Sequence, residues 1–201
     1  MRTVFFDLET KYSSEDVGGW GNIIDMGMSC GVLWDTKTED FSVYLDTDIE
    51  DLIAHMKEAE LIVGFNHIGF DHMVVAGAAH AGKEDRQKLY TELVELNNMD
   101  MLVELKKTLG HRLKLDSIAR PTLGVGKSAD GLQALQWYKE GKLDKIIEYC
   151  KVDVEVTRDV YKYALSKGEL QYESRSGVKK VKVDWEPTEP KKPAMEQMSL
   201  F

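Results

Sequence analysis

TVFFDLET, residues 3–10, is the stretch of the chain from which the fold can be inferred. Its apolar residues predict a short strand over 3–8 in the interior of a sheet. Side chains alternate along a strand, so Asp7 and Glu9 share one face and Leu8 lies on the other. Two carboxylates beside a core repel each other and lose hydration, which costs several kcal/mol per ion when nothing compensates it. Lys11 is the nearest base in the sequence, and a divalent cation would compensate the two charges better.

The patterning on either side of this strand predicts an α/β domain. Further strands are expected at residues 23–34, 41–45 and 61–65, the first two forming an antiparallel meander with 3–8. Helices are expected at residues 48–60, 68–81, 100–109, 116–123, 132–140 and 143–166. Asp48, Asp100 and Asp116 are expected to cap three of these helices at their N-termini. Strands first and then alternating helix and strand indicate a mixed sheet flanked by helices.

Length and composition exclude several classes of protein. The chain has 201 residues, enough for about one domain, and a net charge of −9. A protein that holds nucleic acid on a broad basic face would not be this acidic. We expect no membrane association, because no apolar run is long enough to cross a bilayer and no secretory segment is evident. Cys30 and Cys150 are far apart and form no zinc-binding pattern, which favours a cytoplasmic location.

Further acidic residues fall at the starts and faces of predicted helices. Asp71 lies where the helix over 68–81 begins, and Tyr149 and Asp153 lie one turn apart on the longest predicted helix. Ligands that are all oxygen suit Mg²⁺ or Mn²⁺. Two such ions about 3.5–4 Å apart can clamp the attacking and leaving oxygens of a phosphoryl transfer. A tyrosine hydroxyl one turn from a metal ligand can orient the attacking water.

Each of these residues also has an ordinary structural explanation. Asp7 and Glu9 could face solvent, and Asp71 could favour a helix N-terminus through the macrodipole. Tyr149 could belong to the core, and Asp153 could pair with a base. The joint occurrence of all five favours the metal site.

Three motifs in this order resemble the DEDD 3′→5′ exonucleases of the ribonuclease H-like fold, in their tyrosine subclass. DxE followed by Thr matches Asp7 to Thr10, NxxxFD matches Asn66 to Asp71, and YxxxD matches Tyr149 to Asp153. The similarity covers residues 3–165. DxE or YxxxD alone is a weak signal, whereas the three in their expected elements are a specific one.

The resemblance implies a reaction and a role for each residue. Asp7, Glu9 and Asp153 would hold one divalent cation, and Asp7 and Asp71 would help to hold a second. Tyr149 would orient the nucleophilic water, and a nucleoside 5′-monophosphate would be released from a 3′ end. Bound cations would locally reverse the acidic field of the protein. The residues expected to contact the terminal nucleotide are Leu8, Thr10 and Asn66.

Two weaker signals lie near these motifs. The run from Gly124 to Ser128 resembles the end of a phosphate-binding P-loop, but Pro121 stands where that motif requires glycine. Lys127 in this run is instead a candidate contact to a substrate phosphate. His67 and His72 flank Asp71, and we expect them at the surface or behind the metal ligands.

The C-terminal region has a different composition. We expect a nuclease domain over residues 1–170, a hairpin over 171–185 turning at Ser176–Gly177, and a proline-containing linker and tail over 186–201. The tail resembles the bacterial sliding-clamp-binding pentapeptide. Four residues match, and a methionine replaces the usual leucine, which an apolar pocket should accept. The five residues are Gln197, Met198, Ser199, Leu200 and Phe201.

The sequence therefore predicts a metal-dependent 3′→5′ exonuclease acting on single-stranded or frayed DNA 3′ ends. Tethering to a clamp would raise the enzyme's local concentration at DNA and offset its acidic charge. Two alternatives stay open: an exoribonuclease with the same site, and a catalytically silent adaptor that binds the clamp or nucleic acid.

Overall fold

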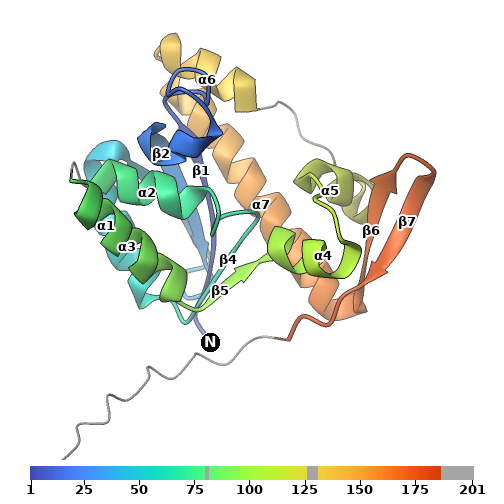
Figure 1. Cartoon of the computed structure of the whole chain (residues 1–201). Coiled ribbons are helices and arrows are strands. Elements are labelled where there is room, and N and C mark those ends of the chain that lie inside the picture. The colour runs from blue at the N-terminus through green and yellow to red at the C-terminus, as the bar shows by residue number, and fades with distance from the viewer. Residues whose placement is uncertain (80–81, 126–130, 187–201) are drawn as a thin grey trace, which may run out of the picture.

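Helices cover both faces of a five-stranded mixed sheet in the computed structural model, which describes residues 1–79, 82–125 and 131–186 (Figure 1). The strands are β1 (Thr3–Thr10), β2 (Met28–Asp35), β3 (Asp40–Leu45), β4 (Leu61–Gly64) and β5 (Asn98–Asp100). Their order is β3-β2-β1-β4-β5. The first three form the predicted antiparallel meander, and β4 and β5 continue parallel to β1. The predicted fold class and the interior position of β1 are confirmed.

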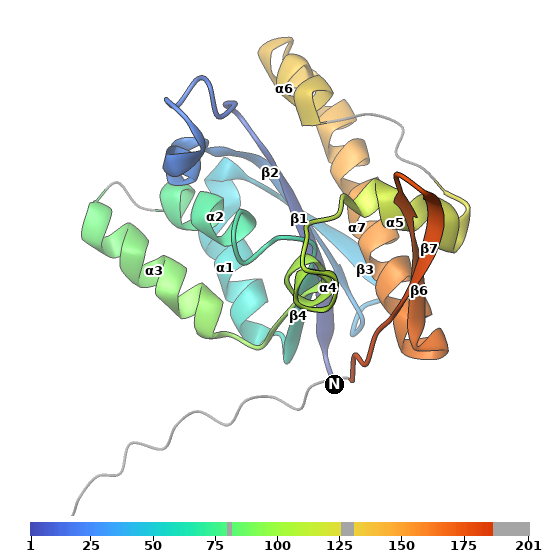
Figure 2. The same cartoon turned by 45° about the vertical axis from the view of Figure 1, so that its right-hand side comes forward.

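Two layers of helices enclose the sheet, as Figure 2 shows. One layer contains α1 (Ile49–Glu58), α2 (Asp71–Ala79) and α3 (Lys83–Glu95). The other contains α4 (Met101–Leu109), α5 (Leu115–Leu123), α6 (Gly131–Lys139) and α7 (Leu143–Lys167). The predicted hairpin is present as β6 (Glu169–Ser174) and β7 (Gly177–Lys182), and β6 packs beside α5 and α7. Its turn lies at Arg175 and Ser176, one residue earlier than predicted, because Gly177 already pairs with Ser174 in the ladder. No helix in the described parts of the chain is long and apolar enough to cross a bilayer.

Alternation along β1 divides the core in two. Val4, Phe6 and Leu8 are buried with residues of α1 and α2. Phe5 is buried on the opposite face with residues of α7. Because the period of a strand is two residues, the series that begins at Phe5 continues with Asp7 and Glu9. Both carboxylates therefore face the layer that contains α7.

The second strand is shorter than predicted. Residues 23–25, expected in the strand, belong to a short 3₁₀ helix, η1 (Trp20–Asp25), and β2 begins only at Met28. Gly27, with φ +61°, adopts the left-handed conformation that separates the two elements. The apolar residues Ile23 and Ile24 gave this segment the composition of a strand.

Two elements were missed altogether. Helix α3 is largely charged and buries only Leu89 and Leu93, so its periodicity is weak. Strand β5 has three residues and joins the sheet through β4. Neither element carries a strong local signal, and both are stabilised by packing against other parts of the chain.

The three predicted caps have different outcomes. Asp100 caps α4 as expected, accepting hydrogen bonds from the amides of Leu102 and Val103. Asp48 precedes α1, but its carboxylate accepts from the Leu45 amide and caps no amide of that helix. Asp116 was predicted wrongly. It lies in the first turn of α5, after Lys114 at the N-cap, and pairs with Arg120 one turn on at 2.7 Å.

Candidate metal centre

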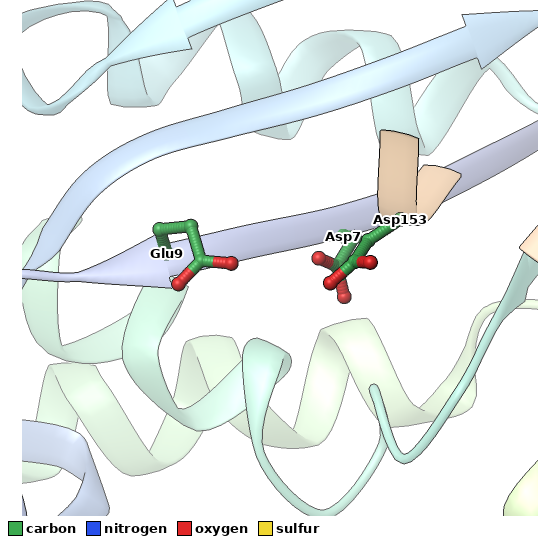
Figure 3. Close-up of side chains that lie close together, drawn as sticks. All are labelled: Asp7, Glu9 and Asp153. Carbon is green, nitrogen blue, oxygen red and sulfur yellow. The ribbon is translucent and has the colours of Figure 1, made fainter. Parts of the chain in front are cut away.

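Three carboxylates converge between β1 and α7. Asp7 and Glu9 project from one face of β1, and Asp153 approaches them from α7 (Figure 3). Each offers an oxygen, and these oxygens all lie within 4.8 Å of one another. Asp153 is buried, while Asp7 and Glu9 are partly exposed. Residues 146 positions apart are thus brought to one point by the packing of a helix on a strand.

The register of α7 against β1 places Asp153. The buried side of this helix packs on β1 and β2 and carries both Tyr149 and Asp153. Between them, Cys150 is fully buried, and its Sγ donates to the backbone carbonyl of Asp7 at 3.4 Å. The same sulfur lies 3.9 Å from Asp7 Oδ2. This contact ties the helix to the strand at the position of the first carboxylate.

Tyr149 lies at the same end of the helix. Its side chain is buried, and its ring meets the Trp137 ring of α6 edge to face, with centroids 6.2 Å apart. Tyr149 also lines the cavity that contains the three carboxylates. The aromatic contact restrains the ring at the wall of this cavity.

Asp71 enters the same cavity from the other layer of helices. It is the first residue of α2, and its Oδ1 accepts a hydrogen bond from the backbone amide of Leu8 at 3.2 Å. Burial raises the pKa of Asp71 to about 7. Among the described residues, the cluster within 4.8 Å comprises the other three acids and does not include Asp71. A cation beside it would favour the charged form.

The loop before Asp71 is held by Asp100. One oxygen of Asp100 accepts from the Asn66 amide at 2.9 Å and the other from the Ile68 amide at 3.1 Å. Asn66 itself has a left-handed backbone with φ +71°. Sequence reasoning identified Asp100 only as a helix cap and missed this second role, because the loop lies 32 to 34 residues earlier.

His67 and His72 are not at the surface. Both side chains are fully buried, and their Nε2 atoms lie 3.1 and 3.0 Å from the Asn98 side-chain oxygen. Burial lowers the pKa of His67 to about 4 and that of His72 to about 3, so both are neutral at pH 7. His67 belongs to the loop that precedes Asp71, and His72 follows Asp71 on α2. Asn98, which gathers them, carries no local sequence signal and was missed.

The carboxylates line a cavity of about 430 Å³, a size typical of small-molecule sites. Leu8, Thr10 and Asn66, the predicted nucleotide contacts, line it as well. Lys127 lies outside the described residues, as do the five tail residues from Gln197 to Phe201. The donor set is all oxygen and drawn from converging carboxylates, which is compatible with a hard divalent cation.

Comparison with known proteins decides the family. The model of the RNase_H superfamily matches residues 4–165, which is most of the chain. The chain belongs to the RNase H superfamily. The matched part of this RNase H-like chain extends from β1 to near the end of α7. It contains Tyr149 and the four acidic residues of the cavity, Asp7, Glu9, Asp71 and Asp153. No curated protein matches the chain.

A solved structure supports the same fold. The family B DNA polymerase from the hyperthermophilic archaeon Pyrobaculum calidifontis is similar over 82% of this chain, with a TM-score of 0.59 and 14% sequence identity. This RNase H-like chain spans only 24% of that polymerase, so the similarity concerns one part of the larger protein. The predicted ribonuclease H-like fold is therefore confirmed, and it is a nuclease fold.

Proposed function

We propose that this protein is a 3′→5′ exonuclease of the DEDD type, tyrosine subclass, that releases nucleoside 5′-monophosphates from DNA 3′ ends. The observation that carries the proposal is the convergence of Asp7, Glu9 and Asp153 within 4.8 Å. Asp71 and Tyr149 lie in the same cavity and complete the five-residue set.

The residues divide into metal ligands and groups that position the reactants. Asp7, Glu9 and Asp153 would bind one Mg²⁺ or Mn²⁺, and Asp7 and Asp71 a second. When bound, two such ions stabilise the charge that develops on the attacking and leaving oxygens. Tyr149 orients the water at the scissile phosphorus.

Contacts to the substrate come from elsewhere in the cavity. Leu8, Thr10 and Asn66 contact the terminal nucleotide, which is supported by their place in the cavity wall. Lys127, which lies outside the described residues, is the candidate contact to a phosphate of the strand. These residues contact the substrate, whereas metal binding and orientation of the water are assigned to the acidic residues and Tyr149.

Recruitment to DNA is assigned to the tail. A net charge of −9 gives the protein poor intrinsic affinity for phosphates, and bound cations reverse the field only locally. The tail from Gln197 to Phe201 resembles the pentapeptide that binds bacterial sliding clamps, so we assign it a clamp of that type in the cytoplasm. Tethering raises the local concentration of enzyme at DNA. The tail also favours DNA over RNA as the substrate.

A mononucleotide-release assay tests the proposal. The full chain is incubated with 5′-labelled oligonucleotides, DNA and RNA matched in sequence, in Mn²⁺ and in EDTA. We expect stepwise shortening from the 3′ end, with nucleoside 5′-monophosphate as the product. Shortening should occur in Mn²⁺ and not in EDTA, and the DNA should be shortened faster than the RNA. Asp153→Asn is the control against a contaminating nuclease.

Two results would contradict the proposal. Faster shortening of RNA would make the protein an exoribonuclease, because the 2′-hydroxyl is the main difference between the two substrates. No nucleotide release from either substrate, with clamp binding retained, would make it an adaptor.

A further inference from the structure

The cavity that holds the carboxylates continues across the surface as a groove. A second hollow of about 730 Å³ shares Asp7, Asn66, Tyr149 and Asp153 with the first. A third, of about 420 Å³, shares Asn66, Leu102 and Arg112 with the second. The three hollows therefore form one depression that leads from the carboxylates toward α4. We call this depression the α4 groove.

The two ends of the α4 groove carry opposite charge. The carboxylates mark one end, whereas the far end is lined by Lys106, Lys107 and Arg112. The hollow between the two ends is lined by Lys114 and by Asp116. Lys107 pairs with Glu104 at 2.6 Å, so part of its charge is offset. The three cations of the far end lie in the hollow that adjoins the acidic site, although the chain as a whole has a net charge of −9.

One of these cations is fixed relative to the site. Arg112 Nη2 donates to the Asn66 side-chain oxygen at 2.8 Å. The Asn66 amide in turn donates to Asp100, which anchors the loop leading to Asp71. Arg112 is thus linked by one hydrogen bond to the loop that leads to Asp71, and that loop is linked by a second to Asp100. Its position along the groove is set by the same contacts that set the site.

Two large apolar side chains are exposed to solvent at the acidic end of the groove. Trp20 is 70% exposed and Leu132 is 72% exposed, and both line the first hollow. Trp20 begins η1, which lies at the same end of the molecule as α6, while α4 lies nearer the middle (Figure 2). Helix α2 approaches η1 so closely that a Cβ on Gly77 would meet the Ile24 carbonyl at 1.7 Å. Trp20 is therefore presented by a segment that is packed against the domain.

We propose that the α4 groove holds the unpaired strand on the 5′ side of the scissile phosphate, with phosphates along Lys106, Lys107 and Arg112 and a base against Trp20. The inference rests on the proposed exonuclease function and extends it to a substrate with several unpaired nucleotides. Phosphates complement the basic end, and aromatic rings stack on bases of any sequence. The exposed ring of Trp20 suits the unpaired bases of a single strand rather than the stacked bases of a duplex.

Equilibrium binding tests the groove without relying on catalysis. Anisotropy of 5′-fluorescein oligothymidylates of two to eight nucleotides is measured with the full chain in EDTA, at several salt concentrations. We expect affinity to rise with length beyond two nucleotides. Lys106→Gln with Lys107→Gln should weaken binding about 10-fold at ~50 mM salt and lower the salt slope by about 0.7 per lost phosphate contact.

Two further variants make the test specific. Trp20→Ala should weaken binding about 10-fold with the salt slope retained, because stacking involves no charge. Lys88→Gln, on α3 and away from the groove, removes a lysine charge and should bind as the wild type does. Affinity independent of length, a double lysine variant that behaves as Lys88→Gln, or tighter binding of a blunt duplex would each overturn the inference. Binding as expected without nucleotide release would refute only the proposed exonuclease activity.

Discussion

The Asp71 carboxylate accepts a hydrogen bond from the backbone amide of Leu8, 63 residues earlier, at 3.2 Å. Leu8 lies between Asp7 and Glu9 on β1, so this bond ties the start of α2 to the strand that carries two of the three clustered acids. A main-chain amide therefore helps to set where the fourth acid lies, together with the packing of α2 in the core.

This bond separates the structural role of Asp71 from its proposed chemical role. Asp71→Asn keeps an oxygen that can accept from the Leu8 amide. It removes the buried carboxyl group, whose pKa is raised to about 7. In EDTA at neutral pH we expect the free energy of unfolding in urea to rise, while nucleotide release is lost. Asp71→Ala also leaves the Leu8 amide unsatisfied and should destabilise the fold by about 1–3 kcal/mol. Nucleotide release retained by Asp71→Asn would remove this residue from the metal site.

Tyr149→Phe removes one hydroxyl and keeps the ring contact with Trp137. We expect kcat for nucleotide release to fall about 10²-fold, because a poorly placed water reacts slowly. The Mn²⁺ affinity, measured by calorimetry, should equal that of the wild type. Tyr163→Phe, farther along the same helix, serves as the control. A kcat equal to that of this control would show that the Tyr149 hydroxyl takes no part.

Asn98 is the centre of a buried polar network, so its truncation should be costly. Its side-chain oxygen lies within hydrogen-bond distance of both buried imidazoles, and its nitrogen donates to the carbonyls of Leu93, Val94 and Leu96. Asn98→Ala should lower the free energy of unfolding by at least ~3 kcal/mol, since several buried groups lose their partner together.

The neighbouring residue offers a matched comparison. Asn97→Ala removes a bond from its amide nitrogen to the Glu60 carbonyl near the surface. We expect a loss of about 1 kcal/mol or less in the same urea titration. Equal losses for the two variants would argue against the network as a structural centre.

Asp35 should make the protein sensitive to acid. Burial alone would raise its pKa, but hydrogen bonds from Arg2, the Lys37 amide and His55 outweigh burial and lower the pKa to about 2. A lowered folded-state pKa gives stability that is present above the unfolded value near 4 and lost as pH falls through 2. The contribution is about 2 kcal/mol at neutral pH.

Acid titration of two variants measures this contribution. Asp35→Asn should be less stable than the wild type at pH 7 and lose less stability on acidification. Asp40→Asn, at the exposed start of β3, should follow the wild-type curve. Identical pH profiles for Asp35→Asn and the wild type would contradict the assignment.

The proposed clamp contact is separable from the chemistry. Deletion of residues 197–201 should abolish binding to a bacterial sliding clamp, measured by surface plasmon resonance, because the apolar side chains of Leu200 and Phe201 are removed. Nucleotide release from short oligonucleotides should equal that of the full chain. Alanine at Lys191 and Lys192 controls for a nonspecific effect of the tail. Undiminished clamp affinity after the deletion would rule out the motif.

Local periodicity accounts for what could be predicted. The alternation of VFFDLE predicts that Asp7 and Glu9 share a face, and the four-residue spacing of Tyr149 and Asp153 predicts that they share a side of one helix. Both hold in the structure. The boundary at Gly27 and helix α3 were missed because a left-handed glycine and a mostly charged helix leave little periodic signal.

The central strand, the long helix and the acidic residues that they carry follow from local periodicity, because strand and helix periods depend only on neighbouring residues. Three contacts arise only when the layers pack: Asp71 accepts from the Leu8 amide, Asn98 contacts two buried histidines, and Arg112 donates to Asn66. These contacts join segments 26 to 63 residues apart, and their partners are selected by how whole layers pack.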